Sequence, residues 1–235
     1  KGVIENMEFI QFHPTSLYNP GERPSFLITE AMRGFGGLLR LQNGKEFMQK
    51  YHPMGSLAPR DVVARSIDHE LKISGEEFVY LDITHKDPKE VMSHFPNIYK
   101  KCLSIGIDLT KDMIPVVPAA HYCCGGIKVN LNGESSIRRL YALGEASSTG
   151  LHGGNRLASN SMMEEAVYAD AAARHAISVI DSIELQRDIP AWDYEGTAVP
   201  EEMALITQDY KEMQQIMTNY VGIVRSNLSL KRAMR

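Results

Sequence analysis

Side chains that could do chemistry are concentrated in four parts of the chain, residues 11–34, 58–61, 118–122 and 144–161. These parts supply guanidinium, imidazole and hydroxyl groups, but no pair of carboxylates poised for hydrolysis. Guanidinium groups bind carboxylates through paired hydrogen bonds, and imidazole and hydroxyl groups add further donors. The inventory therefore indicates a site for a small anion with two carboxylates, which requires the four parts to meet in space.

The cationic and imidazole candidates for this site are Arg60, Arg156, His13 and His121. Arg60 stands at the predicted start of a helix, where the helix dipole disfavours a cation. A structural role alone does not account for an arginine at that position. We therefore interpret Arg60 as a functional residue.

Several other candidates have a structural interpretation that the sequence leaves open. His13 precedes a proline and fits an ordinary turn histidine, and Arg156 fits a salt-bridge donor. Glu30 is spaced to pair with Arg33 on a helix surface. Glu145 follows a predicted strand and could simply end it.

The first half of the chain is predicted to mix strands and helices. Residues 78–84 are rich in β-branched and aromatic side chains, which is typical of a strand. A helix is predicted to open at Pro59 and to end near Gly75, with its apolar side chains on one face. A further helix is predicted to begin at Asp87 and to run toward Gly106.

The second half is predicted to begin with short strands around a turn at residues 132–133, followed by a strand at 140–143. A glycine-rich loop at 150–154 contains His152, for which structural and functional roles are equally open. This loop leads into a predicted helix that passes through Ile177, and the pattern breaks near Pro190 and Pro200.

The last stretch is predicted to be an amphipathic helix. Apolar side chains recur at helical spacing from Met203 to Val224, and several of them are methionines. We expect this stripe to pack in a core against other helices, because methionine adapts to irregular apolar surfaces.

Composition excludes several classes of protein. Hydrophobic residues make up 43% and charged residues 23% of the chain, and the net charge is -4, so we expect no nucleic-acid partner. No apolar run approaches the roughly 20 residues of a membrane span. The three cysteines favour reduced thiols and a cytoplasmic location. We assign no metal site, because the adjacent Cys123 and Cys124 would chelate one tetrahedral ion badly.

Five motifs in order resemble the flavoprotein family of succinate dehydrogenase, fumarate reductase and L-aspartate oxidase. They occupy residues 12–15, 29–34, 59–67, 121–126 and 150–161. The resemblance extends from residue 7 to at least residue 177, and the segments 118–122 and 149–153 look like the L-aspartate oxidase branch. The chain departs from the family pattern at Phe35, commonly glutamate, and at Met162–Met163, commonly two leucines.

The resemblance implies an α/β fold with three parts. Residues 7–123 would form an α+β capping domain, 124–192 the second part of a discontinuous Rossmann-like FAD domain, and 193–235 the start of a helical domain. The glycine fingerprint that holds the FAD pyrophosphate in such families does not occur in this sequence. We therefore expect an internal segment that binds FAD poorly by itself and is inactive alone.

The resemblance also assigns roles to residues, with FAD as the cofactor and an aspartate- or fumarate-type dicarboxylate as the substrate. Arg60 matches the family's proton-transfer arginine. The implied substrate-binding residues are Gln11, His13, Thr29, Glu30, His121 and Arg156. The implied FAD-binding residues are Glu145, Asn160, Ser161 and Met162, the last three at a helix start that would face the flavin.

The activity that follows is oxidation of L-aspartate to iminoaspartate, with oxygen or fumarate as the electron acceptor. This reaction opens the quinolinate route to NAD and implies quinolinate synthase as a partner. Two alternatives stay open: a fumarate reductase or succinate dehydrogenase flavoprotein subunit, and a non-enzymatic cap domain that binds dicarboxylates.

Overall fold

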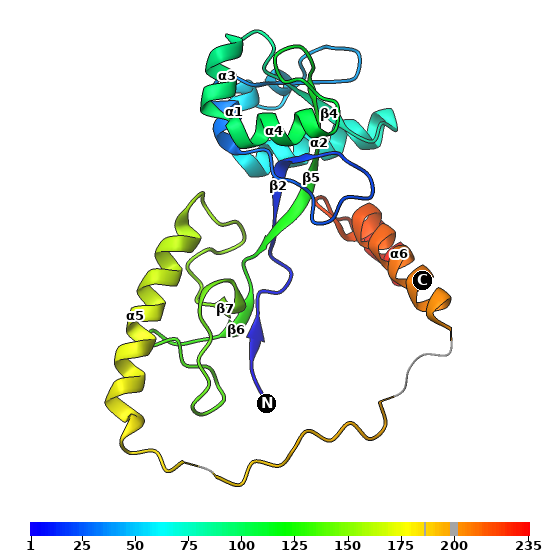
Figure 1. Ribbon diagram of the computed structural model, residues 1–235. Helices are drawn as coiled ribbons and strands as arrows, with labels where there is room; N and C mark the ends of the chain where they lie inside the picture. Colours follow the sequence, from blue (N-terminus) through cyan, green and yellow to red (C-terminus); the bar gives the residue numbers. More distant parts are fainter. Residues whose placement is uncertain (186, 198–201) are drawn as a thin grey trace.

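Two lobes joined by a pair of long strands make up most of the molecule. The computed structural model describes residues 1–235 apart from 186 and 198–201. The strands β2 (Ile10–Leu17) and β5 (Ile114–Cys123) pair antiparallel and pass from one lobe into the other (Figure 1). We call residues 10–123 the cap lobe, and residues 1–9 with 124–180 the α5 lobe.

The cap lobe is built on a four-stranded antiparallel sheet in the order β2-β5-β4-β3. Short and long helices surround this sheet, and buried aliphatic side chains from Leu17 to Val116 fill the space between them. The remaining elements of this lobe are α1 (Glu30–Gly34), β3 (Leu38–Arg40), η1 (Met48–Lys50), η2 (Gly55–Leu57), α2 (Arg60–Ser74), β4 (Val79–Asp82), α3 (Pro88–His94) and α4 (Pro96–Ser104).

A bulge interrupts β2 close to the site. Pro14 has no backbone N–H to donate to a ladder, and the register with β5 shifts between His13 and Ser16. Inside the bulge the Thr15 N–H turns to the His13 side chain and donates to its Nδ1 atom at 3.2 Å. The proline therefore determines how one candidate imidazole is held.

The helix α2 begins and ends as the sequence predicts. Pro59 occupies the N-cap position, Arg60 is the first helical residue, and Gly75 ends the helix with a φ of 77°. This left-handed conformation carries no steric cost for glycine. Its buried side chains, which include Val63 and Ile67, face the core of the cap lobe. Packing of this face therefore positions Arg60.

The helix predicted from Asp87 to Gly106 is wrong as a single element. Asp87 caps α3 through the N–H groups of Lys89 and Glu90, as expected. The chain then breaks at Phe95, and Pro96 starts the separate helix α4. The proline disfavours helical geometry at the preceding residue and cannot donate an N–H, so the helix has to restart.

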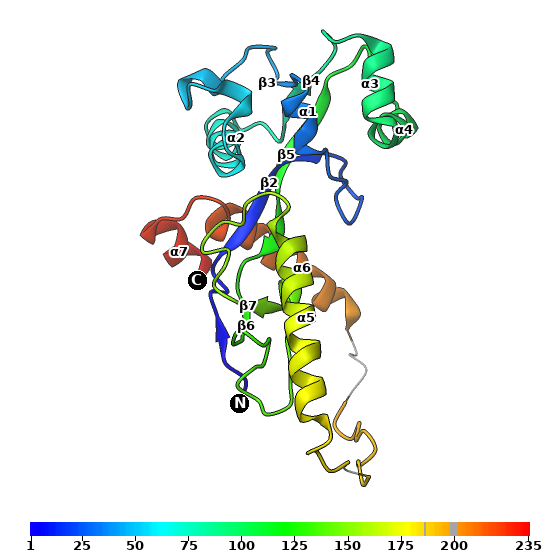
Figure 2. The ribbon, with the colours of Figure 1, turned by 90° about the vertical axis from the view of Figure 1, so that its left-hand side faces the viewer.

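The α5 lobe combines a small sheet with one long helix. Strand β6 (Gly126–Lys128) lies between β1 (Ile4–Glu5), antiparallel to it, and β7 (Ser147–Ser148), parallel to it. The helix α5 (Asn160–Ile180) runs along this sheet and follows the glycine-rich loop, as predicted (Figure 2). The strand predicted at 140–143 is wrong, because Arg139 turns the chain with a φ of 67° and only an isolated bridge joins Tyr141 to Glu134.

The C-terminal helices lie against the junction of the lobes. They are α6 (Met203–Ile216), the π-helical turn η4 (Met217–Val221) and α7 (Asn227–Ala233). Arg225 Nη2 donates to the Glu8 carbonyl at 3.2 Å and ties this region to the start of β2. No helix in the described part of the chain is long and apolar enough to cross a membrane.

The expectation that the methionine stripe packs in a core is wrong for the described chain. No residue of α6 is buried, and Met203, Tyr210 and Met213 are each more than half exposed. Apolar periodicity predicted the helix but could not show whether a partner covers its face. Pro200, where we expected a break, lies outside the described residues, whereas Pro190 lies in an irregular stretch.

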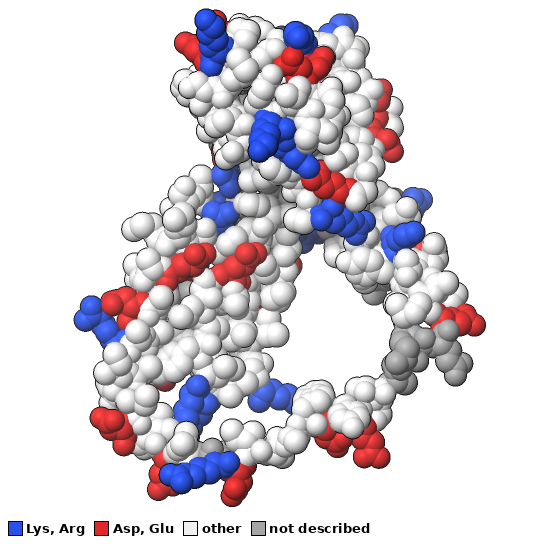
Figure 3. Space-filling view, viewed as in Figure 1, with Lys and Arg blue, Asp and Glu red and all other residues white. Residues whose placement is uncertain are grey.

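The predicted α/β class is confirmed, since helices and antiparallel or mixed sheets occur together. The division at residues 123 and 192 stays a prediction. Basic and acidic side chains are interspersed on the face shown in Figure 3, and wide uncharged areas lie over the α5 lobe.

Candidate functional site

An open cleft of about 350 Å³ lies where the two lobes meet. Five of the six residues predicted to bind substrate line it, together with Arg60. They come from β2, the N-cap of α1, β5 and the segment between the glycine-rich loop and α5, and Arg60 comes from α2. The lining residues are His13, Leu27, Thr29, Glu30, Arg60, His121, Arg156, Ala158 and Ser159. A smaller hollow of about 110 Å³ on the cap lobe contains no cationic or imidazole side chain.

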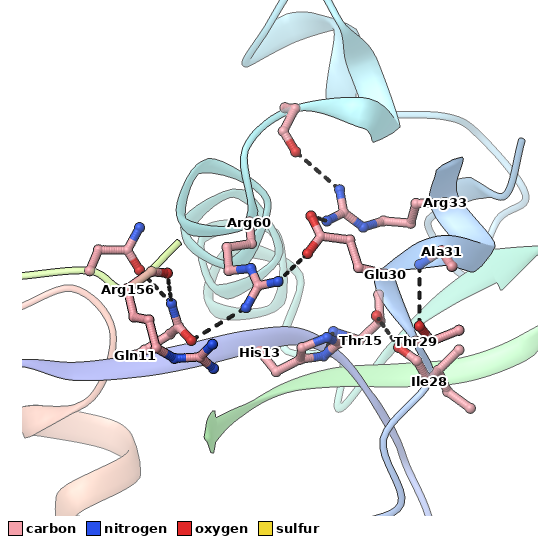
Figure 4. A network of polar contacts seen from close by, with 12 residues as sticks. Gln11, His13, Thr15, Ile28, Thr29, Glu30, Ala31, Arg33, Arg60 and Arg156 are labelled. Carbon is pink, nitrogen blue, oxygen red and sulfur yellow. Dashed lines mark hydrogen bonds and ion pairs between the residues drawn. The ribbon is translucent and has the colours of Figure 1, made fainter. Parts of the chain in front are cut away.

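An ionic network on the cap side of the cleft holds Arg60 (Figure 4). Glu30 accepts from Arg33 Nη2 at 2.8 Å with one oxygen and from Arg60 Nη2 with the other. Arg33 is fully buried, and its Nη1 donates to the carbonyls of Ser56 at 2.8 Å and Ala58 at 3.0 Å. Glu30 therefore makes the structural pair with Arg33 and also orients Arg60.

Thr29 has a structural role as well as a place in the cleft. Its side chain accepts from the Ala31 N–H at 3.3 Å and so caps α1. Such a cap satisfies one of the unpaired amides of a helix start. The hydroxyl still lines the cleft, which leaves its O–H available to a ligand.

Gln11 links the two lobes at the back of the cleft. Its Oε1 accepts from Arg60 Nη1 at 3.3 Å, while its Nε2 donates to Asn155 Oδ1 at 3.0 Å and to the Arg156 carbonyl. The side chain is only 2% exposed. One amide therefore fixes the spacing between the arginines of the two lobes, as Figure 4 shows.

The two histidines of the cleft lie against each other. Their ring centroids are 5.4 Å apart, edge to face. Burial lowers the pKa of His13 to about 3, with further effects from His121 and Arg60. Because Thr15 N–H donates to its Nδ1, the neutral His13 ring carries its proton on Nε2. Burial, then Arg156 and Arg60, also lowers the pKa of His121.

Arg156 lies on an aromatic face. Its guanidinium carbon is 4.3 Å from the centroid of the Tyr122 ring, within the range of a cation–π contact. The residue is 5% exposed, and its Nε atom has no hydrogen-bond partner among the described residues. Arg156 also lines the cleft, so a guanidinium group is available there to an anion.

The predicted cofactor residues are placed in two locations. Glu145 lies in the short helix η3 (Gly144–Ala146) rather than at a strand end, so that expected setting is wrong. Its Oε1 accepts from the Cys123 N–H at 2.9 Å. Asn160, Ser161 and Met162 form the first turn of α5, beside the cleft residue Ser159.

Sequence reasoning missed several residues that hold the site. Arg33 appeared only as a partner of Glu30, although its i,i+3 spacing signalled the contact. Tyr122 and Asn155 lie inside the family motifs, but no spacing rule indicates that they contact Arg156 or Gln11. Nothing in the sequence indicated the buried Glu164.

The profile of the family described as FAD binding domain matches residues 1–162. The chain belongs to the FAD binding domain family. Among curated members, the chain is 50% identical over 230 residues to the L-aspartate oxidase of Pseudomonas aeruginosa, covering 98% of this chain and 43% of that protein. It is 51% identical to the L-aspartate oxidase of Acinetobacter baylyi, covering 98% of this chain and 42% of that protein.

A solved member with a similar fold is the quinol fumarate reductase of E. coli. Its TM-score is 0.76 at 30% identity, over 99% of this chain and 44% of that chain. The chain therefore spans less than half the length of the relatives that it matches. Membership of the family confirms the resemblance inferred from the motifs, whereas the site roles stay predictions.

Proposed function

We propose that this chain forms part of an FAD-dependent L-aspartate oxidase, which converts L-aspartate to iminoaspartate with oxygen or fumarate as the acceptor. The observation that carries the proposal is the cleft in which Arg60, Arg156, His13 and His121 converge. Two guanidinium groups and two neutral imidazoles match a four-carbon dianion. Identity of about half the residues to L-aspartate oxidases supports this substrate over other diacids.

The start of α5 fits a flavin at one point. Ser159 has a φ of 65°, and its side chain makes no cap to the amides that follow. The first amides of a helix have no acceptor within the helix, so Ser161 and Met162 can donate to an anionic edge. Leu157 and Met162, both about 70% exposed, provide apolar surface for a ring system. When bound, FAD would supply the acceptor for the C2 hydride.

The remaining steps fall to the side chains of the cleft. Arg156, His121 and His13 bind the two carboxylates, and Thr29 adds a hydroxyl donor. The substrate loses a C2 hydride and an N–H proton, and a C=N double bond forms. Arg60, oriented by Glu30 and Gln11, is the group placed to hold or move a proton.

A second candidate is a fumarate reductase or succinate dehydrogenase subunit, which the fold similarity to quinol fumarate reductase favours. The test is anaerobic addition of L-aspartate to the flavin-loaded full-length enzyme. We expect the flavin to bleach and oxaloacetate with ammonia to form as iminoaspartate hydrolyses. Bleaching by succinate without bleaching by L-aspartate would favour the second candidate. Dicarboxylate binding without any bleaching would indicate a binding domain.

The proposal also covers the cellular compartment of the protein and the enzyme that uses its product. We place the protein in the cytoplasm, supported by three cysteines that are all free thiols. We propose quinolinate synthase as the enzyme that consumes the unstable imine product. Measurement of quinolinate formed by the two enzymes together, against trapping of free iminoaspartate, tests this step.

A further inference from the structure

A buried acid–imidazole pair joins the glycine-rich loop to α5, and neither residue lines the cleft. His152 Nε2 is 2.7 Å from Glu164 Oε2, and the two side chains are 5% and 1% exposed. Thr149 Oγ1 donates to the other oxygen of Glu164. With a carboxylate oxygen as the acceptor, the donor of this contact is the His152 Nε2–H. Both oxygens of Glu164 are thus occupied by the loop.

A buried glutamate–histidine pair is unusual on a helix that is otherwise mostly exposed. Glu164 and Ala172 are the only buried residues of the 21-residue helix α5. A buried carboxylate costs free energy unless it is fully paired, and a helix that buried this face for packing would present an aliphatic residue. Packing alone therefore does not account for the buried Glu164–His152 pair, and the neighbouring side chains have to be considered.

One aromatic ring lies between this pair and Arg156. The His152 ring meets the Tyr122 ring edge to face, with centroids 5.5 Å apart. The Tyr122 ring also contacts the Arg156 guanidinium, whose carbon lies 4.3 Å from the ring centroid. Burial, then Glu164, raises the pKa of Tyr122 to about 12, which keeps the ring neutral.

We propose that Glu164 is a positioning residue that sets the direction of Arg156 through His152 and Tyr122, and so sets the preference for dicarboxylates over monocarboxylates. This inference rests on the proposed dicarboxylate site. The loop contains Gly150, Gly153 and Gly154, which give it little stiffness of its own. Anchors at Thr149 and His152 therefore hold the loop that leads to Arg156, while the Gln11 amide holds the Arg156 carbonyl.

The placement of Glu164 adds a second consequence. Glu164 lies in the second turn of α5. The amides of the first turn are the ones proposed to face the flavin. A single carboxylate thus connects the cofactor-facing helix to the substrate-facing arginine. Loss of this connection is expected to change substrate affinity while FAD remains bound, because Ser161 and Met162 donate through backbone atoms.

The test is Glu164→Gln in the flavin-loaded full-length protein, with succinate and butyrate as probes in titration calorimetry. Glutamine keeps the size of the side chain but removes its charge and one of its two acceptor oxygens, so the charge-assisted contact with His152 is lost. We expect the Kd for succinate to rise about 10-fold or more, as for a lost charge-assisted contact. The Kd for butyrate is expected to change much less, because one carboxylate can bind without Arg156.

The control on the same helix is Asp170→Asn, an exposed acid that pairs with Arg174. It is expected to leave both affinities and the FAD content unchanged. Equal succinate-to-butyrate selectivity in Glu164→Gln and wild type would overturn the inference. So would an equal loss for both probes together with a lower FAD content, because that is the signature of general destabilisation.

A double variant checks the route through the ring. Tyr122→Leu removes the aromatic face, and combining it with Glu164→Gln is expected to be no worse for succinate than the more severe single variant. Additive losses would show that Glu164 does not act through Tyr122 and would refute the proposal. Wild-type protein that binds no succinate would contradict the proposed function itself, whereas succinate binding with unchanged selectivity contradicts only this inference.

Discussion

The cap lobe and the α5 lobe hold their halves of the cleft by different means. In the cap lobe, a continuous set of buried aliphatic and aromatic side chains packs the sheet against α1, α2 and α4. In the α5 lobe, only Cys124, Ala142 and Ala172 are buried apolar residues, and most of α5 is exposed. Its site residues are held mainly by polar contacts.

This difference indicates a division of tasks. Arg60 stands on a helix that is packed into a core, and the buried Arg33 clamps the turn before it. Arg156 stands on a loop, where its guanidinium lies on the Tyr122 ring and its carbonyl accepts from Gln11. The buried carboxylate of Glu164 is three contacts away. A group on a packed element keeps its geometry more closely than one on a loop. We therefore expect Arg60 to determine turnover and Arg156 to determine affinity.

The largest expected effect separates the two arginines. In the full-length enzyme, Arg60→Leu should lower kcat by about 10³-fold or more, because it removes the proposed proton-transfer group. Arg156→Leu should instead raise KM for L-aspartate about 10- to 100-fold, because it removes a carboxylate contact. Steady-state kinetics measure both, and the absorbance of bound FAD is the control. Near-normal turnover in Arg60→Leu would remove this residue from the mechanism.

A matched pair of core and surface variants tests the packing difference. Ile67→Ala, at a fully buried position of α2, should lower the free energy of unfolding by about 2–4 kcal/mol. Ile177→Ala, at a position of α5 that is 72% exposed, should change it by less than about 0.5 kcal/mol. Urea unfolding measures both. Equal losses would show that further structure covers this face of α5.

The smallest expected effect concerns pH. His13 has a pKa of about 3 when folded and 6.5 when unfolded, so between these values only the unfolded state binds the proton. Stability from this group is therefore complete above about pH 6.5 and declines as pH falls toward 3. His13→Gln should flatten the slope of unfolding free energy by up to about 1.4 kcal/mol per pH unit.

The control for pH is His85→Gln, since this imidazole is exposed on the cap lobe. Its urea unfolding between pH 5 and 7 should follow that of the wild type. A slope in His13→Gln as steep as that of the wild type would contradict the neutral-donor role assigned to His13.

The ends of several helices could be predicted from the sequence, because neighbouring residues determine where a helix begins and ends. Pro59 and Gly75 bracket α2, Asp87 caps α3, and the glycine-rich loop precedes α5, all as predicted. The motif order also identified the family before any contact was known. The failures at Pro96 and at residues 140–143 are local as well, since one proline and one left-handed arginine outweighed the apolar pattern.

The sequence by itself determined which groups were available: two arginines, two histidines and a glutamate suited to a diacid and its chemistry. Only the tertiary structure decided that Gln11 makes hydrogen bonds with both Arg60 and the Arg156 carbonyl. It also decided that the Arg156 guanidinium lies on the Tyr122 ring, which in turn contacts His152. These contacts join residues far apart in the chain. Their spacing follows no period of helix or strand, so packing of the two lobes alone brings them together.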